Sequence, residues 1–120
     1  MQTLNVPQIY DRGLADFSAL TPLERDVFVV HDLNLYYEME GGFEDYLLSG
    51  GHTAEIEWLT GTLQRAQDQA SATILIQLMA LTQHDREQMG ALCDHFYHLM
   101  ESRWEAVERY LRQQGVAIAW

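Results

Sequence analysis

The chain has 120 residues, 48% of them hydrophobic, which predicts one domain with a hydrophobic core of ordinary size. Eighteen acidic residues face seven basic ones, giving a net charge of −11, and every basic residue is Arg. This balance leaves no basic surface for nucleic acids or anionic membranes, so direct binding to either is not expected. The negative field favours basic partners, although acidity also serves solubility alone.

Cysteine usage and the N-terminal sequence predict a cytoplasmic protein. Cys93 is the single cysteine, so no disulfide forms within the chain and a reducing compartment fits. The N-terminus MQTLNVPQIYD lacks the basic and apolar regions of a signal peptide. The densest apolar run, ILIQLMAL at 74–81, is too short to span a bilayer.

The first third of the chain predicts a lead-in segment followed by a long helix. Residues 1–20 are punctuated by Pro7 and Gly13, and we expect one short helical turn there, around 14–17. The sequence TPLE at 21–24 combines an N-cap, Pro at the first helical position and Glu three residues after the cap. The helix should run to about residue 40, where Gly41-Gly42 ends it.

Further helical segments follow this first helix. A short one is predicted over 43–48, and after a second Gly pair another over 54–66. Residues 72–81 are apolar nearly all round, which predicts a central, buried helix, and one last helix should run from about 82–85 to Gly115. The predicted fold is all-α: a lead-in at 1–20 and a single domain at 21–120, a bundle of about five helices with a Gly-Gly-Phe corner.

A metal site is the first enzyme-like possibility. Asp94, His95, His98 and Glu101 lie on adjacent turns of the last predicted helix, where two of them could face one ion. A di-iron bundle would need Glu-x-x-His on two helices, and no Glu here has His three residues later. We interpret these residues as ordinary positions at the rim of the core, with a helical metal-binding enzyme as a lesser alternative.

Other catalytic patterns are missing from the sequence. Cys93 falls on the apolar stripe of the last helix, which predicts a buried core thiol and not a nucleophile. The chain contains no Gly-x-Ser-x-Gly, no dinucleotide-binding glycine pattern and no P-loop, whose Lys it also lacks. We therefore predict a protein that is not an enzyme and uses no cofactor.

The Gly-Gly corner gathers acidic residues. Glu38, Glu40, Glu44 and Asp45 flank it, and no basic residue lies between Arg25 and Arg65 to pair with them locally. Unpaired carboxylates are rarely buried, so these side chains should face solvent. Glu55 and Glu57 follow closely, and residues 1–62 hold eleven acids against two Arg.

Residues from about 20 to 76 resemble a bacterial family of acidic, all-helical proteins, long described as a domain of unknown function. The likeness rests on the Leu-Thr-Pro-x-Glu-Arg start at 20–25 and on the corner at Gly41, Gly42 and Phe43. The family often has Asn and Gln where this chain has Glu40 and Asp45, so both departures add negative charge. The family includes a DNA-mimic protein that engages the DNA-binding surface of a transcription factor.

The resemblance implies that this chain is a DNA mimic for a transcription factor or another basic, DNA-binding protein. Eleven charges correspond to roughly 19 Å of duplex at one charge per about 1.7 Å, and a homodimer could present two such patches. An immunity-type inhibitor of a basic toxin such as a nuclease would use the same field, and an acidic scaffold would use none. The carboxylates expected to replace phosphates are Glu24, Asp26, Asp32, Glu38, Glu40, Glu44, Asp45, Glu55 and Glu57.

Overall fold

The computed structural model describes residues 2–37, 42–48, 51–81 and 85–120. Within these ranges the chain is mostly helical, and none of its helices has both the length and the apolarity to cross a membrane. The elements are β1 (Gln2–Asn5), α1 (Val6–Ala15), the 3-10 turn η1 (Phe17–Ala19), α2 (Pro22–Tyr37), α3 (Gly42–Leu48), α4 (Thr53–Arg65), α5 (Gln69–Met79), α6 (Arg86–His98), α7 (Met100–Gln113) and β2 (Val116–Ala119).

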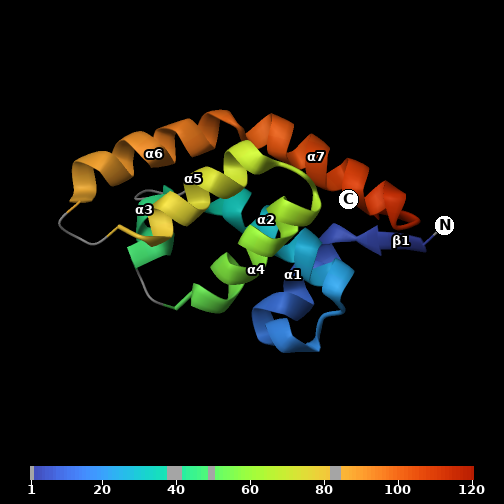
Figure 1. Cartoon of the computed structure of the whole chain (residues 1–120). Coiled ribbons are helices and arrows are strands. Elements are labelled where there is room, and N and C mark those ends of the chain that lie inside the picture. Colours follow the sequence, from blue (N-terminus) through green and yellow to red (C-terminus); the bar gives the residue numbers. More distant parts are fainter. Residues whose placement is uncertain (1, 38–41, 49–50, 82–84) are drawn as a thin grey trace.

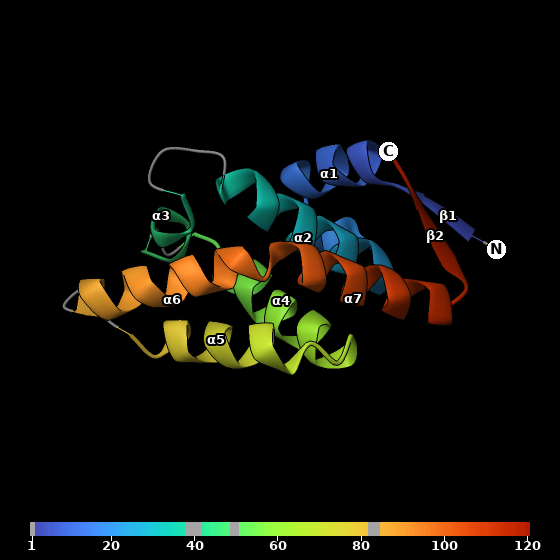
Figure 2. The same cartoon turned by 90° about the horizontal axis from the view of Figure 1, so that it is seen from above.

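Helix α2 lies at the centre of the fold, with α1, α3, α4 and α7 packed around it (Figure 1). Helices α6 and α7 run almost end to end along one border (Figure 1), and α5 packs against both α4 and α6 (Figure 2). The two short strands pair at the end of the molecule where both chain termini lie (Figure 2). This arrangement leaves one face of the α6–α7 rod open along its whole length.

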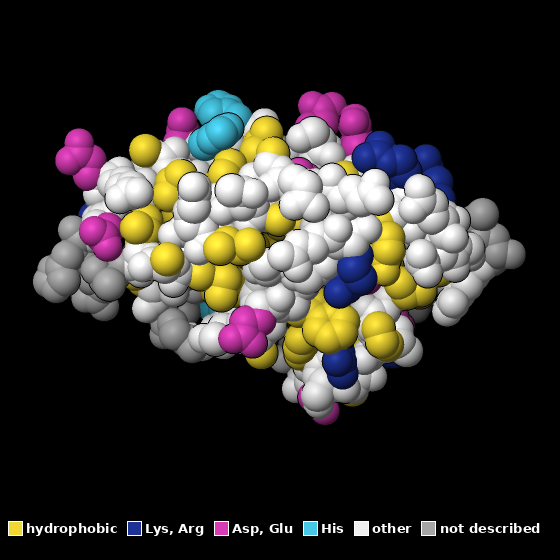
Figure 3. Space-filling model, viewed as in Figure 1, with side chains coloured by type: hydrophobic (Ala, Val, Ile, Leu, Met, Phe, Trp, Pro, Cys, Tyr) yellow, Lys and Arg dark blue, Asp and Glu magenta, His cyan; other side chains and the backbone are white. Residues whose placement is uncertain are grey.

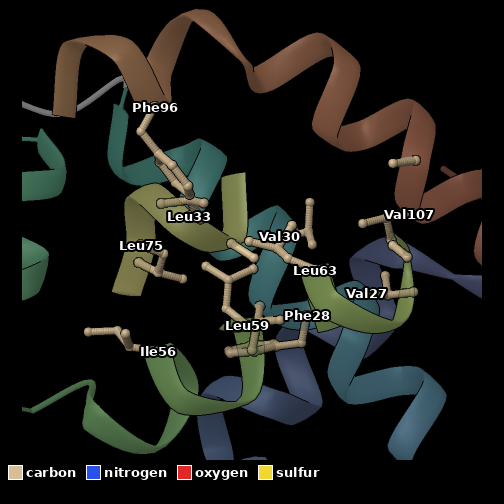
Figure 4. Close-up of a cluster of buried hydrophobic side chains, with 14 of the residues drawn as sticks. Val27, Phe28, Val30, Leu33, Ile56, Leu59, Leu63, Leu75, Phe96 and Val107 are labelled. Atoms are coloured by element: carbon tan, nitrogen blue, oxygen red, sulfur yellow. The ribbon is translucent and has the colours of Figure 1, made fainter. Parts of the chain in front are cut away.

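The core is built from α2, α4 and the helices that cover them (Figure 4). Five consecutive residues of α2, 26–30, are buried, so α2 is enclosed on nearly all sides. The prediction that 72–81 forms the central helix is wrong, because α5 exposes Ile76 at 49% and Met79 at 43%. An all-round apolar sequence is thus compatible with a helix that has one face in water.

The predicted start of α2 is confirmed by its capping hydrogen bonds, and the range predicted for α4 agrees with its bounds. At the start of α2, Thr21 Oγ1 accepts from the Glu24 N–H (3.3 Å) and Glu24 Oε1 accepts from the Thr21 N–H (2.9 Å), a complete capping box. Helix α4 spans Thr53–Arg65, close to the predicted 54–66, but Thr53, expected as its cap, lies inside the helix, and the N-cap residue His52 makes no side-chain capping hydrogen bond. The local capping signal is therefore confirmed for α2 alone.

Residues 1–20, expected as a lead-in, form β1, α1 and η1, and their Leu4, Val6 and Ile9 side chains belong to the core. Asn5 caps α1 by accepting from the Gln8 N–H at 3.0 Å. Gly13 lies inside α1 and is buried where α1 crosses α2. It permits a close helix crossing, whereas the sequence suggested a chain break.

The C-terminal tail is the partner of the first strand. β1 and β2 form a two-stranded parallel sheet in which Gln2 pairs with Val116 and Asn5 with Ala119. Gly115 turns the chain from α7 into β2 with a φ of +77°, a conformation in which glycine is favoured. The expectation of a fold without strands therefore fails at the two chain ends, where each strand is too short to show a periodic pattern.

The single last helix of the prediction is two helices, α6 and α7, separated at Leu99. Arg103 lies at this break. Its Nη1 donates to the Phe96 carbonyl at 2.9 Å and its guanidinium lies 4.0 Å from the Phe96 ring centre, fully buried. The buried cation therefore links the start of α7 to the end of α6.

The predicted Gly-Gly-Phe corner lies partly outside the described residues. Glu38, Glu40 and Gly41 fall in the undescribed segment 38–41, and α3 begins at Gly42. Phe43 is buried and stacks on Phe96 of α6, with ring centres 5.2 Å apart. Phe43 therefore anchors α3 to α6, as an inward-facing residue after the glycines should.

Candidate binding surfaces

The carboxylates predicted as a binding patch do not share one exposed face. Glu38 and Glu40 lie outside the described residues, as does the side chain of Asp45. Six of the nine can be placed, and among these only Glu57, on α4, is fully exposed. The other five are buried or half-buried.

Asp26 is 1% exposed and belongs to a buried hydrogen-bond network, so its assignment to a surface patch is wrong. Its Oδ1 accepts from Trp58 Nε1 at 2.8 Å, from Thr62 Oγ1 at 2.7 Å and from Arg65 Nη2 at 2.7 Å. The cation that pairs with Asp26 is Arg65, at the end of the neighbouring helix α4. A buried carboxylate with these partners fastens α2 to α4 and is unavailable to another protein.

Asp32 is also buried, at 3% exposed, and is likewise corrected as a surface residue. Its Oδ1 accepts from the Tyr10 hydroxyl at 3.2 Å. Burial raises the pKa of Asp32, and this effect outweighs the Tyr10 hydrogen bond, which lowers it. Burial of the Tyr10 hydroxyl, followed by the nearby Asp32 charge, raises the pKa of Tyr10 to about 12.

The three remaining described acids are held within the fold to different degrees. Glu24 forms the capping box with Thr21 and an ion pair with Arg12. Burial alone would raise the pKa of Glu24, but the Thr21 N–H and the Arg12 guanidinium together lower it. Glu44 is half-buried against α6, with Oε1 3.4 Å from where a Cβ on Gly90 would lie, and Glu55 is also half-buried.

Exposed carboxylates gather instead along the open face of α6 and α7. We call the four residues Glu87, Asp94, Glu101 and Glu105 the acidic edge. All four are exposed, and within the described residues none forms an ion pair with Arg. In Figure 3, acidic and His side chains follow the upper margin, where α6 and α7 lie, and basic side chains follow toward the end of α7.

The sequence contains a signal for this edge that the patch prediction did not use. Three of the four edge residues, Glu87, Asp94 and Glu101, recur every seven residues, a spacing that keeps side chains on one face of a helix. At about 1.5 Å per residue, Glu87 and Asp94 are roughly 10 Å apart along α6, and Glu101 and Glu105 roughly 6 Å apart along α7. The edge lies in the half of the chain with the lower net charge, which is why a count of charges missed it.

Two of the four candidate metal ligands, Asp94 and Glu101, belong to the acidic edge, and the other two, His95 and His98, lie near them on α6. Asp94 Oδ1 and His98 Nε2 are 3.6 Å apart, with side chains 74% and 68% exposed. Within the described ranges, no group of three or more His, Cys, Asp or Glu side chains is arranged to hold a metal ion. His95 and Glu101 are exposed on their own turns, so the structure brings together only one pair from the proposed set.

Cys93 is a core residue, as its position on the apolar stripe predicted. It is 7% exposed, and burial, followed by the Glu44 charge, raises the pKa of its thiol to about 12. A thiol with this pKa is a poor nucleophile at neutral pH. Its contribution is to the packing of α6.

Comparison of the chain with protein-family models, with curated proteins and with solved structures finds no match. The likeness to the acidic, all-helical family therefore rests on the quoted residues alone. What it implies about partners stays a prediction.

Proposed function

We propose that this chain is an acidic, non-enzymatic binding protein that engages the basic surface of another protein through the acidic edge of α6 and α7. The observation that carries the proposal is the row of four exposed carboxylates with no Arg paired to any of them within the described residues. Such a row attracts cationic side chains and speeds the encounter with a basic partner.

The pattern of internal pairing supports the same conclusion. Of the seven Arg, Arg65 pairs with buried Asp26, Arg12 with Glu24, and Arg103 is itself buried. Arg112 pairs with Glu108, so four of the seven Arg are paired or buried without contacting the acidic edge. Solubility would be served equally by scattered acids, whereas a row over two successive helices provides a directional contact.

The spacing of the row indicates the kind of partner. Within each helix the carboxylates are about 6–10 Å apart along the axis, whereas successive phosphates of one DNA strand rise about 3.4 Å. The edge thus resembles every second or third phosphate of a strand. A DNA-binding protein whose Arg and Lys side chains reach that far apart fits this spacing, and so does a basic nuclease.

The test is a comparison of two double variants that change the net charge equally. Glu101→Gln with Glu105→Gln removes half of the acidic edge, and Asp11→Asn with Glu57→Gln removes two exposed carboxylates elsewhere. Partners captured from lysate by the wild-type chain are purified, and their release is followed in a salt gradient. We expect the edge variant to release its partner at clearly lower salt than the control variant.

The identity of the partner then distinguishes the two forms of the proposal. Competition by duplex DNA for the same partner supports the mimic, and inhibition of a purified nuclease supports the immunity-type protein. If both variants retain the partner to the same salt concentration as the wild type, the acidic edge is not the binding surface and the proposal fails.

A further inference from the structure

A groove of about 420 Å³ lies between η1, the start of α2 and the outer face of α4, away from the acidic edge. Its walls include Phe17, Arg25, Trp58 and Arg65. In Figure 3 it lies below the middle of the molecule, where basic side chains flank a hydrophobic patch. Two of the seven Arg of a strongly acidic protein therefore face one aromatic groove.

Arg25 is the cation of this groove that has no carboxylate partner within the described residues. Its guanidinium centre lies 5.5 Å from the Phe17 ring and 5.0 Å from the Trp58 ring, and Nη2 donates to the Ser18 carbonyl at 2.8 Å. Its Nε is buried and makes no hydrogen bond. The Nη groups at the tip are therefore the part of Arg25 that can meet a ligand, in the fork geometry that suits a carboxylate.

The opposite wall is fixed in place by Asp26. The same Oδ1 atom accepts from Trp58 Nε1 and from Arg65 Nη2, and the Arg65 guanidinium centre lies 5.6 Å from the Trp58 ring. The indole and the second cation are thus held in position before any ligand arrives. Preorganised groups of this kind lose little conformational entropy on binding.

Two features of α4 limit what the groove can hold. Ala54, four residues before Trp58, is small and leaves room for a flat group to approach the indole, whereas Arg65 covers Gly61, with Nη1 3.1 Å from where a Cβ on Gly61 would lie. Glu57 also lines the groove and is exposed, so it repels a second negative charge. The groove offers one uncompensated cation, one opposing carboxylate and an aromatic wall.

We propose that this groove is a binding site for a small aromatic monocarboxylate, with the carboxylate on the Arg25 tip and the ring against Trp58. A monoanion fits better than a phosphate ester, because Arg65 already shares its charge with Asp26 and Glu57 opposes a dianion. The volume lies in the range of small-molecule sites, which combine an apolar wall with a few fixed polar groups. The site is independent of the acidic edge, so either can fail without the other.

The test uses 1-naphthoate as the probe and the indole N–H signals of uniformly ¹⁵N-labelled protein as the readout. Trp58 is one of three Trp, and Trp58→Phe assigns its signal. We expect millimolar naphthoate to shift the Trp58 signal, whereas the neutral 1-naphthamide does so much more weakly. Arg25→Gln should weaken naphthoate binding roughly tenfold or more, since a charge-assisted pair is lost.

Two control variants separate the site from general charge and from misfolding. Arg86→Gln removes an exposed cation elsewhere and should leave the affinity within about twofold. Ala54→Phe fills the groove from an exposed position without removing a hydrogen bond, and should abolish the shift while the remaining spectrum is unchanged.

A comparison of anions tests the role of Glu57. 1-Naphthyl phosphate should bind more weakly than naphthoate to the wild type, and Glu57→Gln should reduce that difference. The proposal is overturned if naphthoate leaves Trp58 unshifted, if naphthamide binds equally well, or if Arg25→Gln and Arg86→Gln have the same effect.

Discussion

Replacement of Gly13 by Ala should destabilise the protein, because α1 and α2 touch at this glycine. A Cβ at Gly13 would lie 2.3 Å from Cδ2 of Phe28 and 3.0 Å from Cδ1 of Leu20, whereas ordinary carbon contacts are about 3.5–4.0 Å. Phe28 cannot turn away freely, since its ring packs 5.5 Å from both Tyr10 and Phe17.

The two contributions to the free energy of unfolding have opposite signs. Overpacking of a core costs about 1–3 kcal/mol, and the short contact places Gly13→Ala in the upper part of that range. The gain in helix propensity from Gly to Ala returns about 1 kcal/mol. We therefore expect a net loss of about 1–2 kcal/mol in the free energy of unfolding.

Gly90 provides the matched control in α6. A Cβ there meets only Glu44 Oε1 at 3.4 Å, an ordinary contact, so Gly90→Ala should stabilise the protein by about 0.5–1 kcal/mol. Urea unfolding followed by far-UV circular dichroism gives both free energies, with equal m-values as the condition for comparing them. If Gly13→Ala is as stabilising as Gly90→Ala, the close crossing of α1 and α2 is refuted.

Three further predictions concern the buried polar groups. Asp26→Ala should lower the free energy of unfolding by about 2–3 kcal/mol, because three donors lose one acceptor; a loss under about 0.5 kcal/mol in urea unfolding would contradict the network. Since burial raises the pKa of Asp32, the folded state binds its proton more tightly than the unfolded state, so the Asp32 contribution to stability falls as pH rises above the unfolded value near 3.8. Asp32→Asn should remove this loss of stability at higher pH. Glu24→Gln should destabilise the protein most at neutral pH, because the pKa of Glu24 is lowered and its stabilisation is lost as pH falls. Unfolding midpoints measured from about pH 3 to about pH 7 would contradict these two opposite pKa shifts if both variants showed the same trend. The Cys93 thiol should react with an aromatic disulfide reagent at mildly alkaline pH only as fast as the fold opens, so the rate should rise in urea. A rate equal to that of a free thiol would show that Cys93 is exposed.

The elements that the sequence predicts well are those whose signals are local. The TPLE start at 21–24 contains the whole capping box, and both of its hydrogen bonds form between residues three apart. Cys93 is buried because it shares the apolar stripe of its helix. In each case the interaction that decides the structure lies within one or two helical turns, so a single sequence is sufficient.

The features that the sequence did not predict depend on contacts between distant elements. Gly13 resembles a chain break until Phe28 is known to lie against it. The region around Leu99 has neither Gly nor Pro, yet α6 ends at His98, and the contact of Arg103 with Phe96 across the joint is not visible in the sequence. No local preference distinguishes such positions from ordinary helix interior.

The candidate surface shows the same limit for charged residues. The sequence predicts Asp26 and Asp32 as an extension of the acidic patch onto the first long helix, yet Arg65 and Tyr10 reach them from α4 and α1. Counting acids along the chain favoured residues 1–62, whereas exposure favours α6 and α7. A buried carboxylate can find its partner on any element of the fold. The number of acids in a stretch of sequence therefore does not predict how many of them reach the surface.

The pairing of β1 with β2 sets the order in which the protein can complete its fold during synthesis. Gln2 leaves the ribosome more than a hundred residues before Val116, its partner in the sheet. At about 5–20 residues per second, the first strand waits roughly 5–20 s for a partner. During that time the edge of β1 has no strand to pair with, so the sheet can form only after nearly the whole chain has been made.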